Sequence, residues 1–132
     1  SIDGPLLESS WYGGEEYDAR QELPGWDTPH FNHSHWQSAD VSSIPNPNAT
    51  YRSRESPLIE IVEEIAAISV TERGFRTYVF DFGVNHAGWP KLKMRGERGQ
   101  TVTLRPAELL HPDGRINQIT EGTPIFDRYT FA

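Results

Sequence analysis

Short runs of alternating residues, separated by glycine and proline, constrain the fold of this chain more than any other feature. The runs "TYVFDFG", "WPKLKMRG" and "QTVTLRPAEL" all lie beyond residue 76 and place apolar or aromatic residues at alternate positions. Such alternation predicts strands with one buried face. Turns are predicted at Gly83, over residues 96–99 and over residues 112–114, where glycine, proline and aspartate interrupt the runs. Short strands with regular turns favour an all-β fold, an antiparallel β-sandwich.

The segment "LIEIVEEIAAISVTE", which begins at Leu58, fits two kinds of secondary structure. Ile61, Ile65 and Ile68 follow the spacing of one helical face. Ile59 and Ile61 on one parity, with Ile68 and Val70 on the other, instead follow strand alternation. Periodicity leaves helix and strand open here.

The first 57 residues are organised differently from the rest of the chain. Residues 1–41 hold three of the four tryptophans but too few aliphatic residues for a core of their own. Residues 42–57 are rich in proline, serine and asparagine and predict an exposed connection. The chain begins without methionine and ends within a strand-like pattern, so we expect a piece of a longer protein.

Charge and composition exclude several classes of function. The 132 residues include 19 acidic and 12 basic side chains, and the net charge of −7 disfavours nucleic acid or an anionic membrane as partner. A neutral or cationic ligand is expected. Without cysteine the chain has no disulfide or thiol nucleophile, and its compartment cannot be inferred from redox chemistry. No apolar run approaches the roughly 20 residues of a membrane span, so a soluble chain is expected.

Histidines and carboxylates supply weak candidates for chemistry. His30, His33 and His35 lie close together, but no fourth ligand is visible, and a solvated loop is the favoured interpretation. Sugar hydrolysis needs one acid and one base at a fixed separation, which sequence spacing cannot show. We therefore assign neither a catalytic nor a metal-binding residue, and we interpret most carboxylates as surface or salt-bridge groups, including Glu15, Glu16, Asp18, Glu22 and Glu108.

Aromatic residues in loop-like context are more informative. Trp11 and Tyr12 precede two glycines, and Trp26 follows a Pro-Gly pair. Such rings either cap a core or interface, which is the favoured interpretation, or stack on a sugar ring. Asn85 and Trp89 follow a predicted strand and belong to a turn. The candidate carbohydrate-binding residues are Trp11, Tyr12, Asp18, Trp26, Asn85 and Trp89.

Two long segments together resemble a known family. "DGPLLESSWYGGEEYDARQELPGWDTPHFNHSHW" and "YVFDFGVNHAGWPKLKMRGERGQTVTLRPAELLHPDG" resemble the non-catalytic β-domains of bacterial α-L-rhamnosidases of glycoside hydrolase family 78. The likeness covers nearly the whole chain. Val84 stands where the family pattern "F-D-F-G-Q-N-x-A-G-W" has glutamine, and "FNHSHW" stands where the family tends to have acidic residues.

This resemblance implies a domain organisation. Residues 1–41 would be the C-terminal tail of an amino-terminal β-sandwich, and residues 58–132 a truncated jelly-roll or concanavalin-like β-sandwich that lacks its C-terminal edge. Residues 58–71 would then be strand rather than helix. In the family, acidic residues of a separate (α/α)6 barrel hydrolyse terminal α-L-rhamnose from glycosides with inversion. The resemblance therefore implies that this chain is inactive alone and has the remaining domains, including that barrel, as partners.

Cofactor and compartment follow less directly from the resemblance. No cofactor is expected for the chain itself, although some amino-terminal sandwiches of the family bind rhamnose through calcium, which prefers carboxylate and carbonyl oxygens. The bacterial cytoplasm, the periplasm and the exterior all remain open. A free-standing carbohydrate-binding module or lectin-like sandwich is the alternative function. A glycosidase in its own right is a third interpretation, which predicts rhamnose release by the chain alone.

Overall fold

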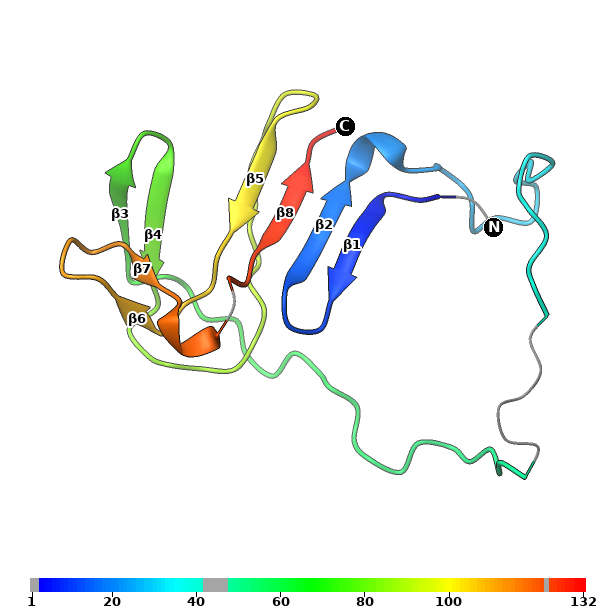
Figure 1. The fold of residues 1–132 in the computed structure, drawn as a ribbon, viewed down its shortest axis with the longest axis horizontal. Coiled ribbons are helices and arrows are strands. Elements are labelled where there is room, and N and C mark those ends of the chain that lie inside the picture. Colours follow the sequence, from blue (N-terminus) through cyan, green and yellow to red (C-terminus); the bar gives the residue numbers. More distant parts are fainter. Residues whose placement is uncertain (1–2, 42–47, 123) are drawn as a thin grey trace.

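The computed structural model describes residues 3–41, 48–122 and 124–132 and consists mainly of short strands (Figure 1). Residues 42–47, the first part of the predicted connection, lie outside the described residues. The elements in chain order are β1 (Leu6–Ser10), β2 (Gly14–Asp18), the 3-10 helix η1 (Ala19–Gln21), β3 (Ser69–Gly74), β4 (Thr77–Asp81), β5 (Thr101–Leu104), β6 (Leu109–Leu110), β7 (Ile116–Asn117), the 3-10 helix η2 (Ile119–Glu121) and β8 (Asp127–Thr130). The predicted all-β class is confirmed.

The largest sheet joins the two ends of the chain. Its four strands have the order β1-β2-β8-β5, and the hairpins β3-β4 and β6-β7 form separate two-stranded sheets. Strand β2 pairs with β8 in parallel, whereas the other described pairings are antiparallel. A parallel pair needs a long connection, since the chain must return to the same end of the sheet. Here the two strands lie more than a hundred residues apart in sequence.

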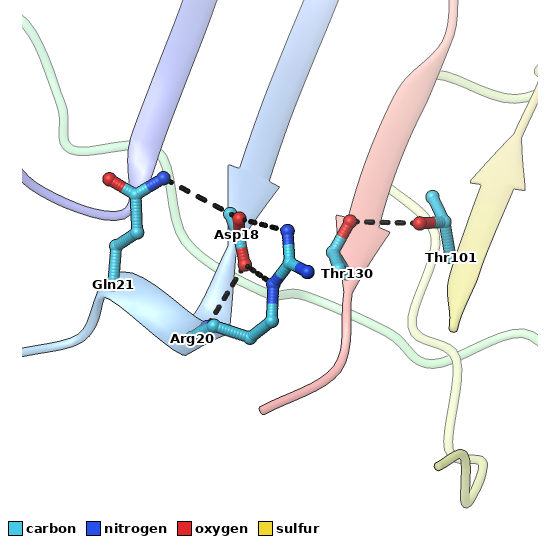
Figure 2. Close-up of polar contacts among 5 residues, drawn as sticks. All are labelled: Asp18, Arg20, Gln21, Thr101 and Thr130. Carbon is cyan, nitrogen blue, oxygen red and sulfur yellow. Dashed lines mark hydrogen bonds and ion pairs between the residues drawn. The ribbon is translucent and has the colours of Figure 1, made fainter. Parts of the chain in front are cut away.

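The two faces of this sheet differ in chemistry because side chains alternate along each strand. On one face, Arg128 Nη1 donates to Glu16 Oε2 at 3.0 Å, and the hydroxyls of Thr101 and Thr130 are 2.9 Å apart (Figure 2). On the other face, the rings of Tyr17 and Tyr129 stack with centroids 5.6 Å apart. Each face thus links segments from both ends of the chain.

Very little of the described chain is buried. Ala19, at 4% exposure, is the buried hydrophobic residue of the described part, and Asp18 and Thr130 are its buried polar residues. Many large apolar side chains face solvent instead, on the strands as well as in the loops. A domain normally closes one contiguous core. The described residues alone do not, so the apolar faces of these strands lack cover within the described part of the chain.

Two strand predictions are wrong. Strand was expected over residues 58–71, but the structure has strand only from Ser69, and Ile59 and Ile61 are exposed in an irregular segment. Residues 89–96 were expected to form a strand and are irregular as well. Lys91 Nζ and Glu64 Oε1 lie 2.6 Å apart and connect the two segments. Alternation alone does not make a strand, because backbone groups also need a neighbouring strand as hydrogen-bonding partner.

Other predictions from the pattern are confirmed. The run "TYVFD" is β4, and "TVTL" is β5. The predicted turn over residues 112–114 connects β6 to β7, where Gly114 N donates to the carbonyl oxygen of His111 at 2.8 Å. Residues 96–99 also form a turn, closed by the bond from Gln100 N to Glu97 O. Local turn chemistry therefore identified corners that do not depend on long-range pairing.

Gly14 allows the close approach of β2 to the segment before β8. Its φ is +94°, and a Cβ atom built on it would overlap the carbonyl oxygen of Phe126. We expect Gly14→Ala to lower the free energy of unfolding by about 1–3 kcal/mol more than Gly122→Ala does. Gly122 is a matched control, because its φ is +76° but no described atom lies within 4 Å of its built Cβ. Urea unfolding of both variants measures the difference, and equal losses would contradict this packing.

Candidate functional site

An open hollow lies beside η1. It encloses about 500 Å³, and residues from before β1, from the end of β2 and from the segment after η1 line it. Tyr17, Trp26 and Trp36 contribute rings to the lining, and Glu22 and Asp27 contribute carboxylates. Small-ligand sites span roughly 300–1,000 Å³ and combine apolar walls with a few polar groups. The hollow falls within this range of volumes and has a mixed lining, but it is open to solvent along much of its surface.

Tyr17 forms a fixed wall of this hollow. Its ring lies nearly parallel to that of Tyr129, with an interplanar angle of 5°. Its hydroxyl donates to Glu22 Oε1 at 2.9 Å. This hydrogen bond to Glu22 is the main cause that raises the pKa of Tyr17, so the phenol stays protonated and continues to donate.

Trp26 lies on a tight turn that holds it at the rim of the hollow. Trp26 N donates to Leu23 O at 3.1 Å, and the hydroxyl of Thr28 donates to Gly25 O at 2.7 Å. Gly25 has φ +81°, a conformation that residues with a Cβ rarely adopt. The turn leaves 63% of Trp26 exposed. A large ring that local backbone bonds hold in solvent is available for contact with another molecule.

Trp36 is held inside the same segment by its neighbours. Its ring lies 5.7 Å from that of Phe31 and 6.5 Å from that of His33. Its indole Nε1 is buried, and no acceptor for it occurs among the described residues. A buried donor without an acceptor is unusual. The indole N–H of Trp36, in the segment after η1, therefore lacks a hydrogen-bond acceptor among the described residues.

Asp18 lies at the edge of this region but its oxygens are already engaged. The residue is 5% exposed, and its carboxylate accepts from Arg20 Nε at 2.8 Å and from Arg20 Nη2 at 2.7 Å (Figure 2). It also accepts from Arg20 N at 3.0 Å and so caps η1. The Arg20 side chain, as the main cause, holds the pKa of Asp18 well below its usual value. This arrangement secures the chain where β2 turns into η1.

The other predicted residues lie elsewhere in the molecule. Trp11 and Tyr12 occupy the turn between β1 and β2, where Ser10 Oγ accepts from Tyr12 N at 3.4 Å. That turn is at the opposite end of β2 from Asp18 (Figure 1). Asn85 and Trp89 follow β4 in the irregular segment, and Trp89 is 62% exposed. The six candidates are thus spread over three places, and sugar binding by them stays a prediction.

Sequence reasoning missed two relationships that the fold creates. Glu108, which has no partner in the sequence pattern, accepts from Asn85 Nδ2 at 3.2 Å. Tyr17 and Trp36 were not among the candidates, although both line the hollow. The sequence pattern does not indicate this, because the two residues meet only through the turn at η1 and the irregular segment that follows it.

The described residues give no support for a metal site. In residues 3–41, 48–122 and 124–132, no three histidine or acidic side chains converge closely enough to hold a metal ion. Within the same ranges, no helix is long and apolar enough to cross a membrane.

Comparison with known proteins matches both halves of the chain. The family description "Alpha-L-rhamnosidase N-terminal domain" matches residues 1–63, and "Bacterial alpha-L-rhamnosidase concanavalin-like domain" matches residues 71–130. An α-L-rhamnosidase of Streptomyces avermitilis is 36% identical over 116 residues, which are 88% of this chain and 11% of that protein. An α-L-rhamnosidase of Alteromonas sp. is 33% identical over 108 residues, which are 82% of this chain and 12% of that protein.

Solved structures give the same result. An α-L-rhamnosidase from Dictyoglumus thermophilum has a TM-score of 0.89 at 37% identity, over 98% of this chain and 15% of that chain. The Streptomyces avermitilis α-L-rhamnosidase complexed with L-rhamnose has a TM-score of 0.88 at 34% identity, over 98% of this chain and 13% of that chain.

The all-β architecture and both matched segments define the chain as a β-sheet part of a glycoside hydrolase. It belongs to the bacterial α-L-rhamnosidase family and includes a concanavalin-like domain. The chain spans only 11–12% of the length of the two curated relatives named above, so further domains accompany such a region in those relatives. The predicted domain limits at residues 41 and 58 stay predictions.

The Asp18–Arg20 pair predicts a specific dependence of stability on acid. Because the folded-state pKa of Asp18 lies below its usual value of 3.8, its contribution to stability is complete above about pH 4. The contribution is lost as the pH falls further and the carboxylate takes up a proton. We expect Asp18→Asn to be less stable at neutral pH and to lose less stability on acidification. Arg20→Gln removes the guanidinium that lowers the pKa of Asp18. We therefore expect it to reduce the pH dependence of stability in the same way.

Urea unfolding midpoints between about pH 6 and about pH 2 measure this effect. The double variant Asp18→Asn, Arg20→Gln is the control, since it should resemble each single variant if the two residues act as one pair. An unchanged acid profile in Asp18→Asn would mean that this carboxylate does not govern acid unfolding.

Proposed function

We propose that this chain is a non-catalytic accessory β-region of an α-L-rhamnosidase, an enzyme that hydrolyses terminal α-L-rhamnose from glycosides with inversion. The observation that carries the proposal is the sheet β1-β2-β8-β5, which unites strands from both matched family segments. A sheet whose strands come from two domains can act as a rigid support for other domains. We infer the reaction from the name of the relatives, which are α-L-rhamnosidases. Those relatives are also long enough to contain a separate catalytic domain.

The exposed apolar surface supports a structural role. On the β3-β4 hairpin, Val70 pairs with Phe80 and Glu72 with Tyr78, so Val70, Tyr78 and Phe80 share one face. All three are exposed. Contiguous apolar surface of this kind marks an interface. We assign it to the remaining domains of the enzyme, including an (α/α)6 catalytic barrel.

The state of the carboxylates favours catalysis outside this chain. Inverting glycosidases need a carboxylic acid and a carboxylate roughly 6.5–9.5 Å apart, both directed at the substrate. In the chain, Asp18 is paired with Arg20 and Glu16 with Arg128. Glu108 accepts a hydrogen bond from Asn85. These acids serve the fold, and the acid and base of the reaction are expected in the barrel.

A free-standing carbohydrate-binding module is the second candidate, and the relatives' length disfavours it. A gene product that stops near residue 132 would support it, whereas several hundred further residues with helical periodicity would support the enzyme. Calcium belongs, if anywhere, to the complete amino-terminal domain. In the described part of this chain, no three histidine or acidic side chains converge on one point.

Hydrolysis of 4-nitrophenyl α-L-rhamnoside tests the proposal directly. We expect the full-length gene product that contains this chain to release nitrophenol, and the 132-residue chain alone to release none. NMR of the first sugar product should show the β-anomer, as inversion requires. The denatured full-length protein is the control for spontaneous hydrolysis.

Activity of the isolated chain would overturn the non-catalytic assignment. A full-length protein inactive on rhamnosides but active on another glycoside would retain the accessory role and change the substrate. In either case the anomer of the product reports the stereochemical course.

A further inference from the structure

We propose that the peptide bond between Arg52 and Ser53 is a processing site for an endoprotease of trypsin-like specificity, and that the two pieces stay joined through β2 and β8 after the cut. In this reaction water adds across the bond, so that Arg52 gains a carboxylate and Ser53 gains a free amino group. The inference goes beyond the proposed function, because it concerns the covalent continuity of the chain and not its relation to sugars.

Residues 49–66 form an exposed, irregular segment. Each of these residues is exposed, and none belongs to a helix or strand. Among the described residues, no backbone-to-backbone hydrogen bond involves this segment, and its first part loops away from the sheets (Figure 1). A protease binds its substrate as an extended chain, and an exposed backbone without internal bonds takes that form at little cost. The segment therefore meets the backbone requirement for proteolysis.

Arg52 and Arg54 are the basic residues of this segment, and they differ in their contacts. Arg54 Nε donates to Ser56 Oγ at 3.0 Å, and Arg54 Nη2 donates to Pro57 O at 2.9 Å. By contrast, no hydrogen bond or ion pair among the described residues engages the Arg52 side chain. A trypsin-like specificity pocket binds an extended arginine side chain through a carboxylate. Arg52 can enter such a pocket without first breaking a bond.

Residues 89–96 form another irregular segment with basic residues, but they have contacts with other parts of the chain. Lys91 Nζ lies 2.6 Å from Glu64 Oε1. Gly96 lies against the ring of Phe131, since a Cβ built on Gly96 would come within 2.5 Å of two ring carbons. These contacts oppose the extended form that a protease binds. We therefore expect residues 89–96 to be cut more slowly than the bond after Arg52.

The cut leaves the two pieces joined, because the contacts between them lie far from it. The first piece keeps β1 and β2, and the second keeps β8, which pairs with β2 in parallel. Glu15 N donates to Asp127 Oδ1 at 3.1 Å, and Phe126 N donates to Gly13 O at 3.1 Å. The ion pair and the stacked tyrosines described above add contacts on both faces of the sheet. Hydrolysis after Arg52 removes none of these contacts.

Limited digestion of the native full-length protein with trypsin tests the site. Mass spectrometry should detect a new amino terminus at Ser53 before any cut within residues 89–96. In Arg52→Gln that terminus should disappear, and cutting within residues 49–57 should slow roughly ten-fold, because Arg54 must first release its hydrogen bonds. Arg54→Gln is the matched control and should change the rate of the cut after Arg52 by less than about two-fold.

A lysine-specific endoprotease supplies a second control on the unmodified protein. Lys91 and Lys93 are the only lysines of the chain, so this enzyme reports access to residues 89–96 separately from the cut after Arg52. We expect it to cut this chain more slowly than trypsin does.

Size-exclusion chromatography of the cut protein tests whether the pieces stay joined. We expect them to elute together in native buffer and apart in urea. Gly14→Ala, which crowds the carbonyl oxygen of Phe126, should lower the urea concentration at which they separate more than Gly122→Ala does.

Three outcomes would overturn the inference. Native protein that resists trypsin at Arg52, while the unfolded protein is cut there, would show that another part of the enzyme covers the segment. A first cut within residues 89–96 would assign the site wrongly, and pieces that separate without urea would contradict the joining through β2 and β8. These measurements do not use rhamnoside hydrolysis, so their failure leaves the proposed enzyme function intact.

Discussion

The parallel pairing of β2 with β8 is the interaction on which the rest of this structure depends. It connects residues near the two ends of the chain and places β1 and β5 on its flanks. Side-chain contacts reinforce it on both faces, through Glu16 with Arg128 and through Tyr17 with Tyr129. The hollow depends on it too, because Tyr129 fixes the ring of Tyr17. Without this pair, the two matched family segments would share no sheet.

The exposed apolar residues of this chain fit its relation to much longer proteins. Strands of this chain carry apolar residues that a complete domain would bury, yet Ala19 is the buried hydrophobic residue of the described part. Relatives in which this region is a small fraction of the length have other domains available to cover such surface. Within the chain, the Glu16–Arg128 ion pair joins β2 to β8, and the Asp18–Arg20 pair secures the entry into η1.

Features that local interactions determine could be predicted from the sequence, and features that depend on contacts with other segments could not. Strand β4 and the turn between β6 and β7 were found because alternation and turn residues act locally. The strand prediction for residues 58–67 was wrong, since their isoleucines fit strand spacing but their backbone pairs with no strand among the described residues. Trp26 was found as an exposed ring in a turn. Tyr17 and Trp36 were missed, because only the turn at η1 and the irregular segment after it bring them beside Trp26.

The distance that the chain travels before β2 meets β8 has a consequence for how the molecule acquires its structure. The backbone of Glu15 bonds to the side chain of Asp127, 112 residues later. Contacts of such high sequence separation form slowly, since a long loop must close before they contribute any stability. During synthesis, the β1-β2 hairpin leaves the ribosome with its parallel edge unpaired and waits for the last strand. Until β8 is made, that edge is open to pairing with another strand.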